Sequence, residues 1–204
     1  MAEPATTGTI LASANPGKLR ELAKLLEPLG RTLRDIAHFK IESPEETGLT
    51  FVENALIKAR HASVKTGWPA IADDSGLVVD ALNGAPGIYS ARYAGVGASD
   101  DENLWKLLDD LEGVPTAQRG ASFFACVVYM RHAADPAPLI CYGQWQGRIL
   151  EAPRGANGFG YDPIFAVPER DFRASAELLP EDKNGISHRG RALKLLINGL
   201  RAAK

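Results

Sequence analysis

The sequence predicts an α/β or α+β fold built on a mixed β-sheet with flanking helices, and we take α/β as its class. The chain opens with a β-prone run that leads directly into an amphipathic helical pattern, which is the alternation found in α/β proteins. Two long β-prone runs, residues 121–131 and 139–149, follow one another and indicate an antiparallel hairpin. A helical bundle or a β-sandwich would not combine these patterns.

Composition limits the classes of protein that fit. With 204 residues and 45% hydrophobic content, the chain suits one domain, or a domain with a small lobe. Its net charge of −2 gives no global reason to bind nucleic acid, although a local basic pocket is compatible with it. Residues 1–8 lack a targeting pattern, and no apolar run approaches the roughly 18 residues that span a membrane. Cys126 and Cys141 lie in apolar runs, which predicts buried free thiols and a cytoplasmic location.

The first strand is predicted over residues 9–13, and a helix then opens at Gly17-Lys18 and continues to Gly30. The connecting turn at 13–18 presents backbone N–H groups and the positive end of a helix dipole, and Lys18 adds a charge. This combination can bind an anion, although the Walker pattern is absent. An ordinary capped helix with an exposed lysine is the alternative interpretation.

A short strand at 32–36 precedes a loop that carries Glu42, Glu45 and Glu46. Thr50 then caps a helix over residues 51–65, with Glu53 as its capping-box partner. The predicted apolar side of this helix is Phe51, Ala55, Ile57 and Ala62. The acid pair is either solvated loop charge or a second acidic cluster that could share a cation with acids elsewhere.

Residues 70–80 form an apolar, β-prone run that two adjacent acids, Asp73 and Asp74, interrupt before Ser75-Gly76. Neighbouring carboxylates at the edge of a core need compensation, for which a bound cation or a shared proton is typical. The alternative is that the acids only cap a turn at Ser75-Gly76, followed by a separate strand at 77–81. The residues alone leave these two interpretations evenly balanced.

The rest of the chain continues the mixed pattern. We expect a loop at 83–93, a helix at 100–111 capped by Ser99, the hairpin with its proline-containing loop at 134–138, and a glycine-rich loop at 155–163. A final strand is predicted at 164–167, and a last helix begins at His188 or Arg189. The leucines expected to face inward are Leu104, Leu107, Leu108 and Leu111 in the first of these helices, and Leu193, Leu195, Leu196 and Leu200 in the last.

The polar stretches of these elements have complementary chemistry. Carboxylates can hold Mg²⁺, which prefers a few carboxylates with waters and substrate phosphates. Lys18, Lys58 and a helix N-terminus can hold the phosphates themselves. Phe159, which stands between two glycines, offers an aromatic face on which a base can stack, although core packing is the alternative. A metal-assisted reaction on a nucleotide therefore fits the residue types.

With these motifs in place, the sequence resembles the inosine triphosphate pyrophosphatase family, also called XTP/dITP diphosphatases. The resemblance runs from residue 9 to residue 200. It is carried by Glu-Glu-Thr-Gly-Leu-Thr-Phe at 45–51, Asp-Asp-Ser-Gly-Leu at 73–77, Gly-Ala-Pro-Gly-Ile-Tyr-Ser-Ala-Arg-Tyr at 84–93, Gly-Phe-Gly-Tyr-Asp-Pro-Ile-Phe at 158–165 and Ser-His-Arg-Gly at 187–190. It implies an elongated mixed sheet in a single domain over 1–204, with an active-site cleft between two lobes and the β-hairpin forming part of the second lobe.

The resemblance also implies an activity and a partner. The expected reaction is Mg²⁺-dependent hydrolysis of deaminated purine nucleotides (ITP, dITP, XTP and dXTP) to the monophosphate and pyrophosphate, which cleanses the nucleotide pool. The expected assembly is a homodimer, with no nucleic-acid or membrane partner.

The resemblance assigns roles residue by residue. Asp74 activates the attacking water, and Glu45 and Asp74 bind the metal, with Glu46 and Asp73 as second acids. The residues assigned to the substrate are Ser13, Ala14, Asn15, Pro16, Gly17, Lys18, Ser75, Phe159, Gly160, Tyr161, Asp162, Lys183, His188 and Arg189. Lys58 joins them on the chemical argument given above.

Two alternatives belong to other functional classes. One is a pyrophosphatase for other modified nucleotides on the related Maf-like, septum-inhibition-type fold, against which the Ser-His-Arg and Phe-Gly-Tyr-Asp strings argue. The other is a nucleotide-binding sensor that has lost catalysis. The presence of Lys18, Glu45, Asp73 and Asp74 argues against a silent site.

Overall fold

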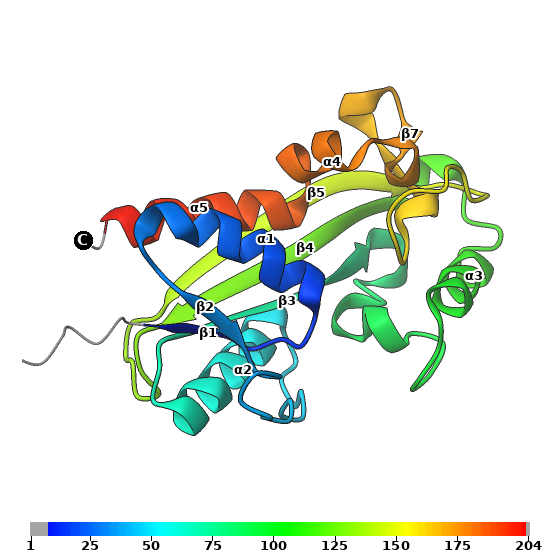
Figure 1. Ribbon diagram of the computed structural model, residues 1–204. Coiled ribbons are helices and arrows are strands. Elements are labelled where there is room, and N and C mark those ends of the chain that lie inside the picture. The colour runs from blue at the N-terminus through cyan, green and yellow to red at the C-terminus, as the bar shows by residue number, and fades with distance from the viewer. Residues whose placement is uncertain (1–7, 203–204) are drawn as a thin grey trace, which may run out of the picture. The chain divides into compact units, whose positions relative to one another are not determined.

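The computed structural model describes residues 8–202, and it confirms the predicted α/β fold (Figure 1). A seven-stranded sheet has the order β2-β1-β3-β4-β5-β6-β7. Strand β1 (Thr9–Leu11) pairs in parallel with β2 (Leu33–Asp35) and with β3 (Ala70–Val79). The pairs β5–β6 and β6–β7 are antiparallel, so the sheet is mixed as expected. We expected no targeting pattern in residues 1–8, but residues 1–7 lie outside the described part of the chain.

The chain divides into two compact units. The first comprises residues 1–74, 126–142 and 192–204, and the second comprises residues 75–125 and 143–191. The strands β3, β4 (Gly120–Met130) and β5 (Leu139–Ile149) contribute residues to both units.

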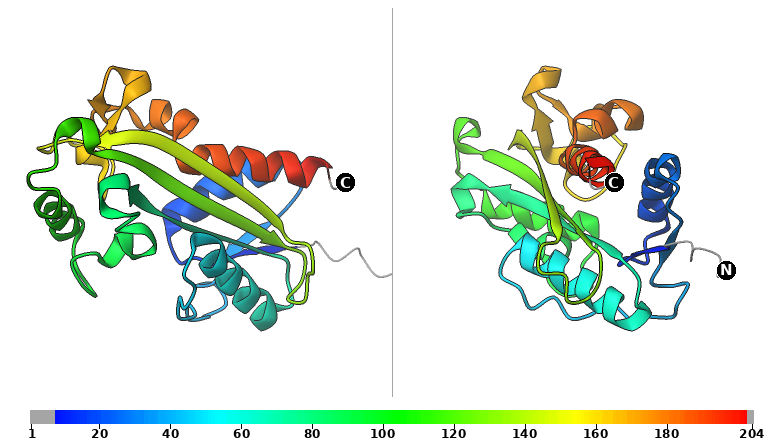
Figure 2. Two further views of the ribbon diagram at one scale, coloured as in Figure 1. Left: turned by 180° about the vertical axis from the view of Figure 1, so that it is seen from behind. Right: turned by 90° about the vertical axis from the view of Figure 1, so that its left-hand side faces the viewer.

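The first unit places helices on both faces of its part of the sheet. Helix α1 (Pro16–Leu26) and residues 192–202 of α5 (His188–Ala202) cover one face, and α2 (Phe51–Thr66) covers the other (Figure 2). Small side chains let α2 approach the sheet closely, because Ala55, Ala59 and Ala62 pack against Ala70 and Ala72 in one buried cluster. Ile57, expected on this apolar side, is only half-buried and does not belong to the cluster.

The second unit has a larger, more aromatic core. Trp145 and Phe165 are fully buried there with Leu77, and the inward leucines of α3 (Asp100–Asp110) join the same cluster. Ser99 and Glu102 form a complete capping box at the start of α3. The predicted inward positions 104, 107, 108 and 111 are all buried.

The structure corrects the interpretation of residues 70–81. No turn interrupts this run, because β3 continues from Ala70 to Val79 through both acids and through Ser75-Gly76. Asp73 and Asp74 are both buried, at 7% and 9% exposure. The pairing of β3 with β1 covers only Ala70 and Ile71, and β3 then continues beside β4, so good turn residues are held in an extended strand here. The turn-capping interpretation is therefore wrong.

Three smaller expectations also need correction. The strand predicted at 164–167 is β6 (Phe165–Val167), but it is not the last, because β7 (Arg173–Ala174) follows. A short helix, α4 (Pro180–Ile186), was not predicted. In α5, Leu193, Leu196 and Leu200 are buried as expected, whereas Leu195 is 51% exposed and faces outward.

Residues Gly87–Arg92 of the loop expected at 83–93 form a 3-10 helix, and the helix expected to reach Gly30 is α1 to Leu26 with a 3-10 turn over Glu27–Leu29; other predictions of local structure hold. The hairpin strands β4 and β5 are neighbours in the sheet, and the loop at 134–138 lies between them. Helix α5 begins at His188. Cys126 and Cys141 are buried free thiols. No helix within residues 8–202 is long and apolar enough to cross a membrane.

Candidate functional site

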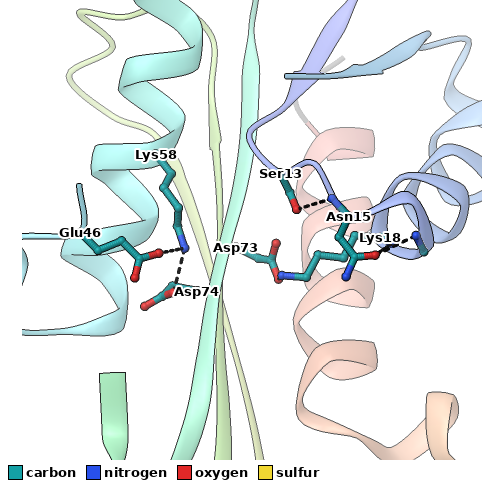
Figure 3. A network of polar contacts seen from close by, with 8 residues as sticks. Ser13, Asn15, Lys18, Glu46, Lys58, Asp73 and Asp74 are labelled. Atoms are coloured by element: carbon teal, nitrogen blue, oxygen red, sulfur yellow. Dashed lines mark hydrogen bonds and ion pairs between the residues drawn. The ribbon is translucent and has the colours of Figure 1, made fainter. Parts of the chain in front are cut away.

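The two adjacent acids of β3 each pair with a lysine from a different helix (Figure 3). Asp73 accepts a hydrogen bond from Lys18 of α1 at 2.7 Å, and Asp74 accepts one from Lys58 of α2 at 2.8 Å. Successive side chains of a strand point to opposite faces, and α1 and α2 cover opposite faces of this part of the sheet. The Asp-Asp pair thus separates into two ion pairs, one on each face.

Lys58 connects Asp74 to the acidic loop. Its Nζ donates to Glu46 Oε1 at 2.9 Å as well as to Asp74 Oδ1. Burial on its own would lower the pKa of Lys58, but the charges of Asp74 and Glu46 outweigh it and the pKa is raised. Lys58 is therefore a charged bridge between the two carboxylates.

Asp74 is left with one unusual oxygen. Its Oδ2 is buried and has no hydrogen-bond donor within the described residues. Burial raises the pKa of Asp74, and the charge of Lys58 opposes this rise only in part. A buried carboxylate oxygen without a partner is costly, so this atom is suited to a ligand that the protein itself does not supply.

The turn at 13–18 is already organised by its own side chains. Asn15 caps α1, and its Oδ1 accepts from the backbone N–H groups of Gly17 and Lys18 at 2.8 and 3.2 Å. Ser13 Oγ accepts from Asn15 N–H at 3.2 Å. Ala14 and Pro16, with Asn15 and Gly17, are exposed. The predicted phosphate-binding turn is thus an exposed helix N-terminus beside the Lys18–Asp73 ion pair.

The second unit brings together a separate group of predicted residues around Asp162. This carboxylate is 2% exposed, and it accepts from Phe159 N–H and from Ser175 Oγ, both at 2.9 Å, and from Lys183 Nζ at 2.5 Å. Lys183 Nζ also lies 5.3 Å from the centre of the Phe159 ring. Since both oxygens of Asp162 are engaged inside the protein, its side chain organises this segment.

The aromatic side chains of this segment behave differently from one another. Phe159 is 78% exposed, so core packing does not explain it. Tyr161 is buried, and its hydroxyl donates to the carbonyl of Ser90 at 2.8 Å, so its ring is part of the core. Gly160 N–H donates to Asp100 Oδ2 at 2.8 Å, which ties the segment to the start of α3.

His188 and Arg189 lie at the first turn of α5, as predicted. The ring of His188 stacks on Phe123, with 4.9 Å between centroids and 14° between planes. Ser187 Oγ accepts from Gly190 N–H at 3.1 Å and so satisfies one amide at the start of this helix. Phe123 therefore fixes the ring plane of His188, a role that no motif in the sequence indicates.

The four acids predicted to bind a metal do not assemble as one group. Asp73 faces α1, whereas Asp74 and Glu46 meet at Lys58, and Glu45 is exposed on its loop. Over residues 8–202, no three His, Cys, Asp or Glu side chains are grouped as a metal site would require. The donor set that best fits a hard cation is Asp74 with the neighbouring acidic loop, because carboxylate oxygens are what Mg²⁺ prefers and Asp74 Oδ2 lacks a partner.

Comparison with known proteins places this geometry in context. The model of the Ham1 family matches residues 9–199. A protein of Yersinia pseudotuberculosis named dITP/XTP pyrophosphatase is 60% identical over 194 residues, which cover 95% of this chain and 98% of that protein.

Two solved structures of Ham1 proteins have the same fold. One from Coxiella burnetii has a TM-score of 0.92 at 52% identity and covers 96% of this chain and 98% of its own. One from Staphylococcus aureus has a TM-score of 0.89 at 39% identity, and the match covers 97% of this chain and 100% of that chain. These matches span nearly the whole chain and confirm the resemblance found in the sequence: the protein belongs to the Ham1 family.

Proposed function

We propose that this protein hydrolyses deaminated purine nucleoside triphosphates, such as dITP, ITP, XTP and dXTP, to the monophosphate and pyrophosphate. The relatives named dITP/XTP pyrophosphatase support the reaction and the substrate class. The structural observation that carries the proposal is Asp74, a buried carboxylate with one oxygen held by Lys58 and the other without a partner.

Asp74 is the general base of the proposed reaction. Water adds to a phosphorus atom, the bond between the α- and β-phosphates breaks, and a carboxylate oxygen of Asp74 accepts the proton. Lys58 keeps Asp74 in place by holding Oδ1, so that Oδ2 can face the water. The raised pKa of Asp74 makes it a stronger base than an exposed aspartate.

Mg²⁺ is the proposed cofactor, held by Asp74 and the acidic loop of Glu45 and Glu46. Bound Mg²⁺ neutralises phosphate charge and lowers the pKa of a coordinated water. Asp73 takes a different role from the one the sequence suggested. Its ion pair with Lys18 positions that lysine beside the exposed turn at 13–18, where the phosphates would bind.

The residues around Asp162 provide the proposed selection of the base. The exposed ring of Phe159 offers a stacking face, and Arg189 and His188 offer hydrogen-bond donors. Inosine and xanthine carry an oxygen at C6, which accepts such donors, whereas adenine carries a donor there and is disfavoured. We propose that this group binds the base of the nucleotide.

Two further parts of the proposal rest on the sequence. The resemblance implies a homodimer. The two free cysteines favour a cytoplasmic location, where thiols stay reduced.

Product analysis tests the proposed function. The purified protein is incubated with Mg²⁺ and, separately, with ITP, XTP, GTP or ATP, and the products are separated by ion-exchange chromatography. We expect IMP and XMP with pyrophosphate, and little product from ATP. A parallel reaction with a chelator in place of Mg²⁺ is the control and should yield no product.

Other outcomes would contradict particular parts of the proposal. IDP with orthophosphate would show that a different phosphate bond is cleaved. Binding of ITP without turnover would favour the catalytically silent sensor. Equal turnover of ITP and ATP would rule out the proposed base selection.

A further inference from the structure

Asn54 is a buried polar residue near the proposed general base, and the sequence patterns gave it no role. It lies on α2 four residues before Lys58, so the two side chains share one face of the helix. Lys58 reaches Asp74 from this face. Asn54 is 0% exposed, which is unusual for an amide side chain and requires a reason.

One half of the Asn54 amide holds the acidic loop. Its Oδ1 accepts from Gly48 N–H at 2.9 Å, two residues after Glu46. Gly48 lies so close that a Cβ there would stand 2.7 Å from Asn54 Oδ1 and 2.5 Å from the Cβ of Glu53. The loop that carries Glu45 and Glu46 is therefore fixed to α2 through a close contact that only glycine permits.

The other half of the amide is buried and unpaired within residues 8–202. Asn54 Nδ2 is buried and has no hydrogen-bond acceptor within residues 8–202. Asp74 Oδ2 is also buried and has no hydrogen-bond donor within the same residues. Burial raises the pKa of Asp74, and the amide of Asn54 is among the groups that oppose this rise, which requires the two side chains to be close. A donor and an acceptor that both lack partners thus lie next to each other.

We propose that Asn54 is a positioning residue of the hydrolytic site, joining the acidic loop to Asp74. Its Oδ1 sets the position of the loop through Gly48. Its amide stabilises the charged form of Asp74 without occupying Oδ2 and so helps to fix how that carboxylate faces the attacking water. This inference rests on the proposed function and adds to it a residue that contacts neither phosphate nor base.

Two substitutions separate the two halves of the amide. Asn54→Asp keeps an oxygen for Gly48 N–H but replaces the donor with a charge that repels Asp74. Asn54→Ala removes both contacts. Ser63→Ala is the matched control, because Ser63 is a buried polar residue of the same helix, 2% exposed, far along α2 from Lys58.

The readouts are kcat and KM for ITP, the melting temperature, and the affinity for Mg²⁺ measured by calorimetry without nucleotide. We expect both Asn54 variants to lower kcat by about 10- to 100-fold, the usual effect of losing a partner that orients a metal-site residue, with KM changed less than about twofold. Only Asn54→Ala should weaken Mg²⁺ binding, because only it releases the loop. Ser63→Ala should leave kcat and Mg²⁺ affinity unchanged.

A folded Asn54→Asp protein with kcat within about twofold of wild type would overturn the inference. If that variant does not fold, Asn54→Ala decides by the same criterion. Equal losses of kcat in Asn54→Ala and Ser63→Ala would show a purely structural role and would also overturn it. Wild-type protein that releases no pyrophosphate from ITP would overturn the proposed function, and the inference with it, before any variant is compared.

Discussion

Asp74 and Lys58 show how one residue pair can prepare a site for chemistry. Asp74 is buried enough for its pKa to rise, yet Lys58 holds one of its oxygens at 2.8 Å and so keeps it ordered. The pKa of Lys58 is raised in turn by the two acids it bridges. Both side chains are held in place without any added ligand, which reduces the ordering that a substrate must impose.

Replacing Asp74 with asparagine tests its role as the base. Asp74→Asn keeps the shape of the side chain but cannot accept the proton, so we expect kcat for ITP to fall by roughly 10²- to 10⁴-fold. The measurement is steady-state kinetics together with a melting curve to show that the variant folds. Asp73→Asn is the comparison, since it changes the neighbouring residue on the other face and should affect KM more than kcat. A folded Asp74→Asn protein with near-normal kcat would remove Asp74 from this role.

The sequence predicted the important acids but not their partners. Adjacent acids in an apolar run were a visible anomaly, and they do lie buried in β3. Which lysine pairs with which acid depends on strand alternation and on which helix covers which face, and neither is local information. Asn54 was missed because an asparagine near the start of a helix is unremarkable in a sequence. The available signal was its position next to alanines on the buried face of α2.

At the scale of elements, the β4–β5 hairpin is closed by one buried carboxylate. Asp135 is 3% exposed and accepts from the backbone and side chain of Arg131, including Arg131 N–H at 2.9 Å, and from Ala137 N–H at 3.1 Å. The hydrogen bonds from Arg131 hold the pKa of Asp135 well below its usual range. The ionised form of Asp135 therefore stabilises the folded hairpin.

The direction of the pH effect follows from this lowered pKa. The stabilisation is fully present above the unfolded pKa of about 3.9 and is lost as the pH falls from there toward the folded pKa. We expect Asp135→Asn to lower the free energy of unfolding at pH 7 by about 1–3 kcal/mol. The difference from wild type should shrink below about pH 4, as the wild-type carboxyl becomes protonated.

Urea denaturation at pH 7 and at several values below pH 4 measures this effect. Asp109→Asn, at an exposed position of α3, is the control and should change stability by less than about 0.5 kcal/mol. A constant difference between Asp135→Asn and wild type across the pH range would contradict the ionic origin of the stabilisation.

Elements with clear end signals were predicted well, and those without were not. The caps Thr50 and Ser99 marked the starts of α2 and α3 correctly, because side-chain capping is local chemistry. Ser75-Gly76 misled, since its turn preference is overridden where β3 continues beside β4 in the sheet. Helix α4 has seven residues, too few for a periodic signal, and β7 has two.

At the scale of the whole molecule, the mixture of strand orientations was predictable but the strand order was not. Parallel pairing of β1 with β2 and β3 follows from the helices that connect them, and a hairpin predicts neighbouring strands. The position of β3 between β1 and β4 depends on contacts distant in sequence. The resemblance to the family in several long motifs predicted the elongated mixed sheet, which the periodicity of the sequence does not predict.

The homodimer is a prediction at this scale. Light scattering coupled to size-exclusion chromatography should give twice the chain mass of 21.9 kDa, and it should do so across a tenfold range of loading concentration. A stable subunit pair does not dissociate over such a range, whereas a weak one shifts by mass action. A mass of one chain at every concentration would show that the resemblance does not extend to assembly in this protein.

Because side chains alternate along β3, the exact length of this strand decides which face of the sheet each acid occupies. Asp73 and Asp74 are neighbours in the gene, yet they serve different helices, α1 through Lys18 and α2 through Lys58. Inserting or deleting one codon in the first half of β3 would send each acid to the other's side of the sheet, even though both acids are kept. For a protein engineer, this strand accepts substitutions far more readily than it accepts any change of length.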